Sequence, residues 1–130
     1  MKIILRMVKK ELIPFLGSDP IAILVYSKKY FAAQFMKKDR SLESITQATS
    51  AGQNNTAAIG GYDAYFGTYK VNEETGDVTH TLIASLSPSN IGMTTVRTLR
   101  VLNNQLMLQL KTTTPEGEDI VRTLIWKRIN

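Results

Sequence analysis

The sequence predicts an all-β fold, a consecutive antiparallel meander of seven or eight strands in one domain over residues 1–130. Short runs rich in β-branched and aromatic residues recur at near-regular spacing, with turn residues between them. Apolar and polar residues alternate within these runs, so each strand has one buried and one solvated face. Such a meander either stacks as a sandwich or closes into a barrel, and eight strands can enclose one small ligand.

The strands are expected in the following order along the chain. Residues 3–15 supply the first strand or a short hairpin, before the Gly-Ser-Asp-Pro turn at 17–20. The remaining strands are expected at residues 21–27, 30–37, 65–72, 77–86, 94–102, 105–112 and 120–129. Gly76 ends a hairpin loop at the position that needs a positive φ, and Asn103-Asn104 forms a two-residue turn.

One segment interrupts the strand pattern. Ser41 begins a Ser-Leu-Glu-Ser sequence typical of a helix N-terminus, and apolar residues follow at helical spacing. Residues 52–55 break that pattern, and residues 56–61 are expected to resume it as a second short turn of helix. We therefore expect a short helical insertion at about residues 41–60.

The tight turns also predict which residues face each other. The turn at 103–104 pairs Arg97 with Leu110, which places Arg97 on the apolar face. The loop at 73–76 places Tyr69 opposite His80. The same register, continued along the two strands, places Tyr65 opposite Ala84.

The last strand has two possible registers. A loop of five or seven residues turns Arg122, Leu124 and Trp126 inward, whereas a six-residue loop turns Val121, Thr123 and Ile125 inward. We prefer the first register because it buries Trp126.

Composition excludes several classes of protein. The chain has no cysteine, which excludes a disulfide scaffold, a Cys-ligated metal and a cysteine nucleophile. No apolar run approaches the ~18 residues of a membrane span. With a single histidine we expect no metal site, and no sequence motif calls for a cofactor. The N-terminal apolar run meets Arg6 before a signal peptide would be complete, so we expect a cytoplasmic protein.

The chain is basic, with 16 Lys and Arg against 11 Asp and Glu and a formal net charge of +5. The cations concentrate before residue 41. A basic excess can mark a nucleic-acid or membrane surface, but no stacking motif of a nucleic-acid-binding fold accompanies it. We therefore interpret it as a solvated face and expect no nucleic-acid partner.

His80 and Tyr69 are the candidate catalytic residues. A histidine titrates near neutral pH and can act as an acid, a base or a hydrogen-bond donor to a polar ligand. The alternative is a core histidine satisfied by a tyrosine or a backbone carbonyl.

Arg97, with Arg122 in the preferred register, is an inward-facing cation. A buried guanidinium needs a partner, and a ligand carboxylate would supply one. The alternatives are that Arg97 reaches solvent at the rim, or pairs with Asp63 or Glu118.

Aromatic residues concentrate in the first half of the chain, a composition that suits either a ligand pocket or ordinary core packing. Gln34 shares a strand face with Ala32 and Met36, and we expect it to be a buried amide. The candidate ligand-binding residues are Tyr30, Gln34, Tyr65, Tyr69, His80, Arg97 and Trp126.

Several motifs follow in a recognisable order over residues 19–130. They are Asp-Pro-Ile-Ala-Ile-Leu-Val-Tyr at 19–26, Ala-Gln-Phe-Met at 33–36, Asp-Arg at 39–40, Gly-Tyr-Asp-Ala-Tyr-Phe-Gly-Thr-Tyr at 61–69, Val-Thr-His at 78–80 and Leu-Ile-Trp at 124–126. In these the chain resembles the bacterial and fungal lipocalin-like domain family. The resemblance implies an up-and-down lipocalin-like β-barrel of about eight strands with a helix-bearing insertion, and it implies little chemistry.

The sequence departs from that family at two places. Members begin with a Gly-x-Trp strand that plugs one end of the barrel, whereas this sequence starts within that strand. An incomplete first strand leaves an edge that invites pairing, so we expect a homodimer. Lys28-Lys29 also stands where the family has Pro, Asp and Gly, which is poor chemistry for a tight turn.

Three functions follow as hypotheses. The first is a binding protein for a small, mostly apolar molecule that carries a carboxylate or another polar group. The second is a cofactor-free isomerase or cyclase that acts on a small hydrophobic metabolite through His80 and Tyr69. The third is a packed barrel with a structural or interaction role.

Overall fold

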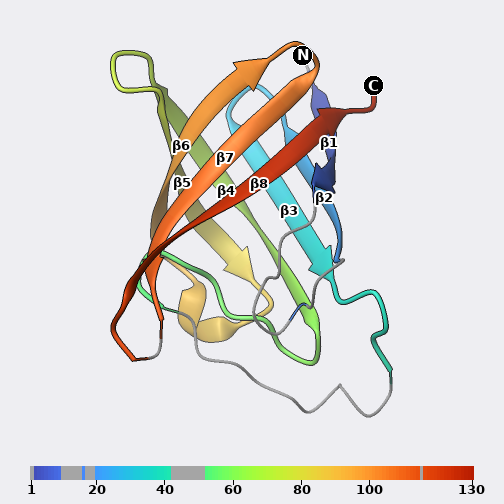
Figure 1. Ribbon diagram of the computed structural model, residues 1–130, viewed down its shortest axis with the longest axis vertical. Coiled ribbons are helices and arrows are strands. Elements are labelled where there is room, and N and C mark those ends of the chain that lie inside the picture. Colours follow the sequence, from blue (N-terminus) through green and yellow to red (C-terminus); the bar gives the residue numbers. More distant parts are fainter. Residues whose placement is uncertain (1, 10–15, 17–19, 42–51, 115) are drawn as a thin grey trace.

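The computed structural model describes residues 2–9, 16, 20–41, 52–114 and 116–130. Its eight strands are β1 Ile3–Lys9, β2 Ile21–Tyr26, β3 Tyr30–Met36, β4 Tyr62–Asn72, β5 Asp77–Ser85, β6 Thr94–Leu102, β7 Gln105–Thr113 and β8 Asp119–Arg128. Each strand pairs with the next in antiparallel order, and β1 pairs with β8 to close the barrel. Figure 1 shows this closed barrel, with both termini at the same end. The predicted all-β barrel is confirmed.

Alternation along the strands separates a packed interior from an outer face. On β3, Phe31, Ala33 and Phe35 are buried. On β7, Leu106, Leu108 and Leu110 are buried in the same way. Trp126 of β8 is 1% exposed and packs within the same core. Because every strand contributes alternate residues, the core runs along the inside of the barrel.

The register predicted from the β6–β7 turn and the preferred register of the last strand are confirmed. Arg97 lies opposite Leu110 across β6 and β7, and Asn103 takes the positive φ of 57° that the turn requires. Between β7 and β8, Thr113 pairs with Asp119, which leaves five residues in the loop. Leu106 therefore lies opposite Trp126, as the preferred register predicted.

The register of the β4–β5 hairpin is confirmed near its loop and wrong farther along. Tyr69 lies opposite His80 as predicted. A bulge then shifts the pairing beside Gly67, so Tyr65 faces Ser85 rather than Ala84. The backbones approach so closely here that a Cβ on Gly67 would lie 1.8 Å from the Thr81 carbonyl oxygen. A bulge adds one residue to one strand, which hairpin counting cannot foresee.

β1 closes the barrel with few pairs. It pairs at four positions with β2 and at four with β8, against nine positions between β7 and β8. β1 pairs with β2 over residues 3–6 and with β8 over residues 5–9. The turn between β2 and β3 also closes tightly, because Ser27 N–H donates to the Tyr30 carbonyl over 2.8 Å.

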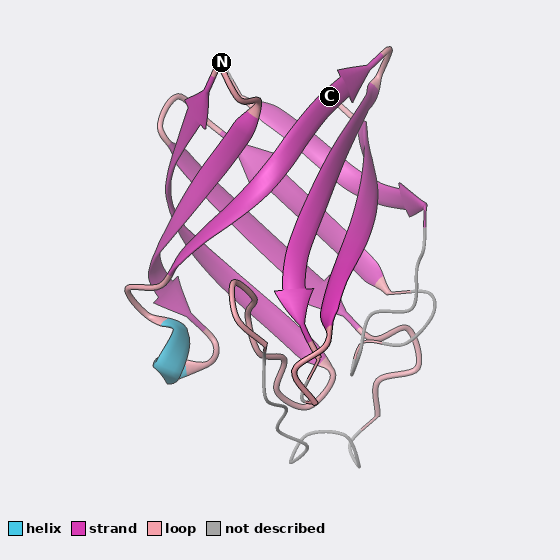
Figure 2. Ribbon diagram, turned by 60° about the vertical axis from the view of Figure 1, so that its left-hand side comes forward, coloured by secondary structure: helices cyan, strands magenta, loops and turns pink. Residues whose placement is uncertain are grey.

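The prediction of a helical insertion is wrong over residues 52–60. Its earlier part, residues 42–51, lies outside the described residues. Asn54, Gly60 and Gly61 adopt positive φ values, which interrupt a right-handed helix. In the described part of the chain, helix occurs only as a single 3-10 turn at Pro88–Asn90, cyan in Figure 2. No helix there has the length and apolar character to span a membrane.

Residues 52–58 are bound instead to the strands at the lower end of the barrel. Below the Arg97–Leu110 pair β6 and β7 diverge, and the Asn54 side chain fills the space between them. Val96 N–H donates to Asn54 Oδ1 over 2.8 Å, and Asn54 Nδ2 donates to the carbonyls of Val96 and Lys111 over 3.1 and 3.0 Å. The side-chain amide thus forms hydrogen bonds to both strands, as the peptide group of a paired strand would.

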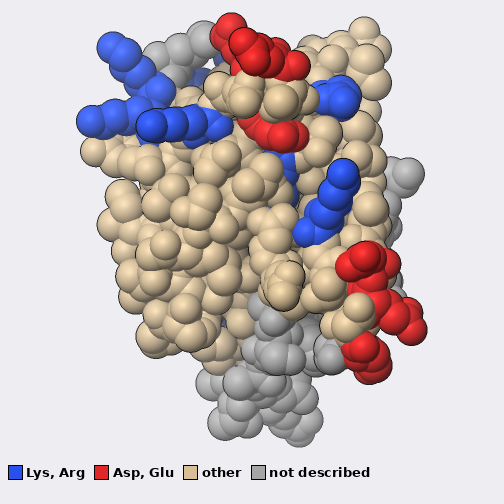
Figure 3. Space-filling model, turned by 90° about the vertical axis from the view of Figure 1, so that its left-hand side faces the viewer, with Lys and Arg blue, Asp and Glu red and all other residues tan. Residues whose placement is uncertain are grey.

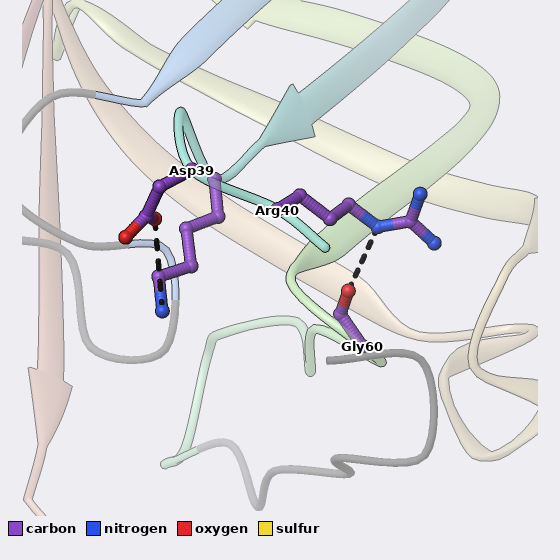
Figure 4. Close-up of polar contacts among 4 residues, drawn as sticks. Asp39, Arg40 and Gly60 are labelled. Atoms are coloured by element: carbon purple, nitrogen blue, oxygen red, sulfur yellow. Dashed lines mark hydrogen bonds and ion pairs between the residues drawn. The ribbon is translucent and has the colours of Figure 1, made fainter. Parts of the chain in front are cut away.

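The chain on either side of residues 42–51 is also joined at this end. Arg40 Nε donates to the Gly60 carbonyl over 2.8 Å, and Lys37 forms an ion pair with Asp39 at 3.7 Å (Figure 4). The Arg40 hydrogen bond connects the chain after β3 to the residues just before β4, on which Asp63 is buried.

Candidate functional site

A cavity of about 360 Å³ occupies the upper end of the barrel, the end of the β2–β3, β4–β5 and β6–β7 hairpins in Figure 1. Its lining residues are Ile3, Leu5, Tyr26, Tyr69, Val71, Val78, Leu99, Val101, Asn103, Asn104, Gln105, Leu106 and Arg128. The walls are mostly apolar, and the polar members Asn103, Asn104, Gln105 and Arg128 are exposed at the mouth. The cavity therefore reaches the surface through a polar rim.

Tyr26 and Tyr69 are the cavity's two aromatic lining residues. Their rings meet edge to face with centroids 4.7 Å apart. The Tyr69 hydroxyl donates to the Ser27 carbonyl over 2.6 Å, and the Tyr26 hydroxyl shares a 2.7 Å hydrogen bond with His80 Nε2. Burial raises the pKa of Tyr26 far above its usual value, so its hydroxyl stays protonated.

His80 lies deeper than the cavity. It is 5% exposed and stacks on Phe31 with ring centroids 4.2 Å apart. Burial, and secondly the charge of Arg97, lower its pKa to about 3, so the ring is neutral near neutral pH. Tyr69 lies opposite His80 in register, but the hydrogen-bond partner is Tyr26. His80 therefore matches the second interpretation of the sequence, a core histidine whose hydrogen-bond partner is a tyrosine.

Arg97 is buried, and its guanidinium donates hydrogen bonds to backbone carbonyls. Its Nη1 donates to the carbonyl oxygens of Asn54 and Val96 over 2.8 and 3.1 Å. Neither Asp63 nor Glu118 forms the ion pair with Arg97 considered from the sequence. Burial lowers the pKa of Arg97, and the nearby Tyr65 and Tyr26 oppose that shift. Arg97 thus anchors the segment at residue 54 to the barrel interior.

Arg122 is the second buried arginine. Arg97 and Arg122 lie on either side of Leu110 in the strand pairing, and both are less than a tenth exposed. The charge of Arg122 also lowers the pKa of Arg97. The middle of the barrel therefore holds two cations close together, as the preferred register predicted.

Asp63 is a buried carboxyl that sequence reasoning considered only as a partner for Arg97. Thr56 Oγ1 donates to its Oδ2 over 2.6 Å, and Oδ1 has no hydrogen-bond partner among the described residues. Burial raises the pKa of Asp63 to about 6, although its hydrogen bonds act to lower that pKa. The inward alternation of β4 was the signal that could have identified it.

The remaining predicted residues divide between the two faces. Tyr65 faces inward against Phe31, and burial raises its pKa to about 12. Gln34 and Tyr30 lie exposed on the outer face, so the buried amide expected at Gln34 is wrong. The reason is that Phe31, Ala33 and Phe35 take the inward positions of β3. The Gln34 Oε1 accepts a hydrogen bond from the Tyr62 hydroxyl there.

This arrangement suits binding better than proton transfer. His80, Arg97, Tyr65 and Trp126 do not line the upper cavity, and the hydroxyl of Tyr69 is already engaged. The cavity is lined mainly by apolar side chains and two tyrosines. The buried cations Arg97 and Arg122 lie deeper in the barrel.

Comparisons with known proteins agree with the fold. The family model for the lipocalin-like domain matches residues 3–129. No curated protein and no solved structure gave a match. Because the family model covers nearly the whole barrel, the chain belongs to the lipocalin-like domain family.

Proposed function

We propose that this protein binds a small, mostly apolar molecule in the upper cavity. The observation that carries the proposal is the cavity itself, which is lined by apolar residues of several strands and reaches the surface. Its volume of about 360 Å³ lies at the small end of the ~300–1,000 Å³ usual for ligand pockets. A barrel packed solid along its whole length, the structural alternative, would leave no such space.

The proposed ligand carries a carboxylate or another polar group directed toward the cavity floor. Tyr26 lines the cavity, and Arg97 lies near enough for its charge to act on the pKa of Tyr26. Arg97 has no acidic partner among the described residues, and a cation in a low-dielectric interior attracts an anion more strongly than it would in water. A ligand acid beside Tyr26 would therefore offset part of the cost of burying Arg97.

Calorimetric titration with a matched pair of ligands, a medium-chain fatty acid and the alcohol of the same length, tests both parts. Leu99→Trp fills the cavity from its wall and should weaken binding of either ligand at least about tenfold, which corresponds to ~1.4 kcal/mol. Val121→Trp, on the exposed face of β8, is the matched control and should bind like the wild type. Equal affinity in all three proteins would place the ligand outside this cavity.

The acid preference is measured separately. The fatty acid should bind wild-type protein about tenfold more tightly than the alcohol, and Arg97→Gln should reduce that ratio toward one. If the acid and the alcohol bind wild-type protein equally, the protein binds apolar ligands but does not recognise an anionic group.

A further inference from the structure

The outer face of strands β2 to β6 carries no charge over most of its height. The outward positions within residues 21–25, 32–36, 62–68, 79–83 and 94–98 are apolar, hydroxyl or amide side chains. Figure 3 looks onto part of this side, and the coloured Lys, Arg, Asp and Glu side chains lie toward its upper end and along one edge. Surface β-strands of monomers usually carry charges among their outward positions, which makes this face unusual.

The β4–β5 bulge presents the most apolar part of this face. Phe66 lies opposite Ala84 and Gly67 opposite Leu82, so Ile83 is the additional residue of the bulge. Phe66 and Ile83 are each 51% exposed and lie next to each other on the outer face. Bulges direct side chains and persist where that direction matters.

Other exposed apolar residues extend the patch around Phe66. Five of the thirteen strongly exposed large apolar side chains in the described part of the chain lie at the outward positions of this face, and two more, Leu86 and Ile91, follow β5. Ile23 lies on β2 and Val96 on β6, each two strands from Phe66 on β4. Leu86 continues the patch at the lower end, where its N–H donates to the Ala64 carbonyl. An uncharged face with several exposed apolar side chains is typical of an interaction site in a soluble protein.

We propose that this outer face, which we call the Phe66 face, is the interface of a homodimer. Because β2 to β6 follow half of the barrel's circumference, a second copy would contact mainly the central part of this face, on β4 and β5 around Phe66 and Ile83. Two such sheets can pack face to face in an isologous arrangement, with Phe66 near the centre where an aromatic contributes most. The proposal is independent of ligand binding, because the Phe66 face and the upper cavity share no residue.

The charge distribution favours a second copy of this chain as the partner. Two copies, each with a formal net charge of +5, repel each other through their charged surfaces. That repulsion is weakest where the contact itself contains no charge, and the Phe66 face meets this condition. The open edge from which dimerisation was expected is closed by β1, so a face rather than an edge provides the contact.

Sedimentation velocity and light scattering test the proposal on the full chain. Wild-type protein should have about twice the monomer mass of 14.5 kDa at high micromolar concentration. Phe66→Lys and Ile83→Lys should each raise the dimer dissociation constant roughly thirtyfold or more, as expected for a charge buried in an interface hot spot. Circular dichroism checks that both variants retain the wild-type β-sheet spectrum.

Val121→Lys is the matched control, because Val121 is an exposed apolar residue on the outer face of β8, which is not part of the Phe66 face. It introduces the same charge and should leave the dimer intact. A monomeric wild type overturns the proposal. If that monomer also binds neutral phosphatidylcholine vesicles, the face is a lipid-binding surface instead. A dimer that both lysine variants leave unchanged, or that Val121→Lys dissociates equally, overturns it as well.

Discussion

Burial shifts the pKa values of two titratable side chains, His80 and Asp63, toward their neutral forms. Burial penalises the charged form, which lowers the pKa of His80 from 6.5 to about 3 and raises that of Asp63 from 3.8 to about 6. Their effects on stability in acid are opposite. The unfolded chain protonates His80 first, so folding loses stability below pH 6.5, whereas the folded chain protonates Asp63 first, so folding gains stability below pH 6.

We expect these two effects to offset each other in the wild type. At about pH 4.5 each amounts to about 2–3 kcal/mol, so the free energy of unfolding should change little between pH 6.5 and 4.5. Asp63→Asn removes the gain and should lose about 2 kcal/mol over that interval. His80→Gln removes the loss and should gain about 2 kcal/mol. Urea unfolding followed by circular dichroism measures all three, and parallel pH curves would contradict the assignment.

At the scale of elements, the segment at residues 52–58 acts as part of the barrel wall. Asn54 bridges β6 and β7 through its side chain, and its carbonyl accepts a hydrogen bond from Arg97. Thr112 Oγ1 donates to the Gln53 carbonyl, and Ala57 N–H donates to Asn90 Oδ1 over 3.0 Å. The segment thus satisfies backbone groups that diverging strands would otherwise leave unpaired.

Asn54→Ala should lower the free energy of unfolding by about 2–4 kcal/mol, because three hydrogen bonds are lost at roughly 1 kcal/mol each and alanine disfavours the positive φ. Asn54→Gly removes the amide but accepts the φ, so its smaller loss isolates the hydrogen bonds. Asn55→Ala is the control, since its side chain accepts one local bond from Thr56 N–H and should cost about 1 kcal/mol or less. A loss no greater at Asn54 than at Asn55 would argue against the bridging role.

Sequence reasoning predicted best where short turns connect strands. The turns after β4 and β6 fix the register, because a one-residue slip would turn every side chain to the other face. This is why the inward positions of His80 and Arg97 were predicted correctly. After β7 the loop length left two registers open, and the burial of Trp126 decided between them. The close approach at Gly67 that produces the bulge involves neighbouring backbones in three dimensions, and no turn residue signals it.

The partners within the site could not be predicted in the same way. Tyr26 and His80 lie on β2 and β5, which are not neighbours in the barrel, so strand pairing cannot bring them together. Asn54 likewise binds residues more than forty positions away in the sequence. The helical pattern at residues 41–60 was a local preference, and over residues 52–60 these distant contacts outweigh it.

At the scale of the whole molecule, the barrel is closed by its shortest pairing. β1 contributes four paired positions to each neighbour, and its pairing with β8 contains a bulge. Strand pairs with few hydrogen bonds open locally at lower free energy than long ones. The closure is therefore where the barrel is expected to open first.

Native-state hydrogen exchange tests this expectation. Amides of residues 4–7 in β1 should exchange at least about tenfold faster than those of residues 106–110 in β7, a difference of ~1.4 kcal/mol in opening free energy. Equal protection of β1 and β7 would show that the barrel opens only as a whole.

Trp126 gives this molecule an optical property of its own. It is the only tryptophan of the chain, it is 1% exposed, and its Nε1 has no hydrogen-bond partner among the described residues. It lies opposite Leu106, which lines the upper cavity. All tryptophan emission therefore comes from one dry indole beside the cavity wall, so the unlabelled protein carries a single intrinsic fluorophore that can report cavity occupancy.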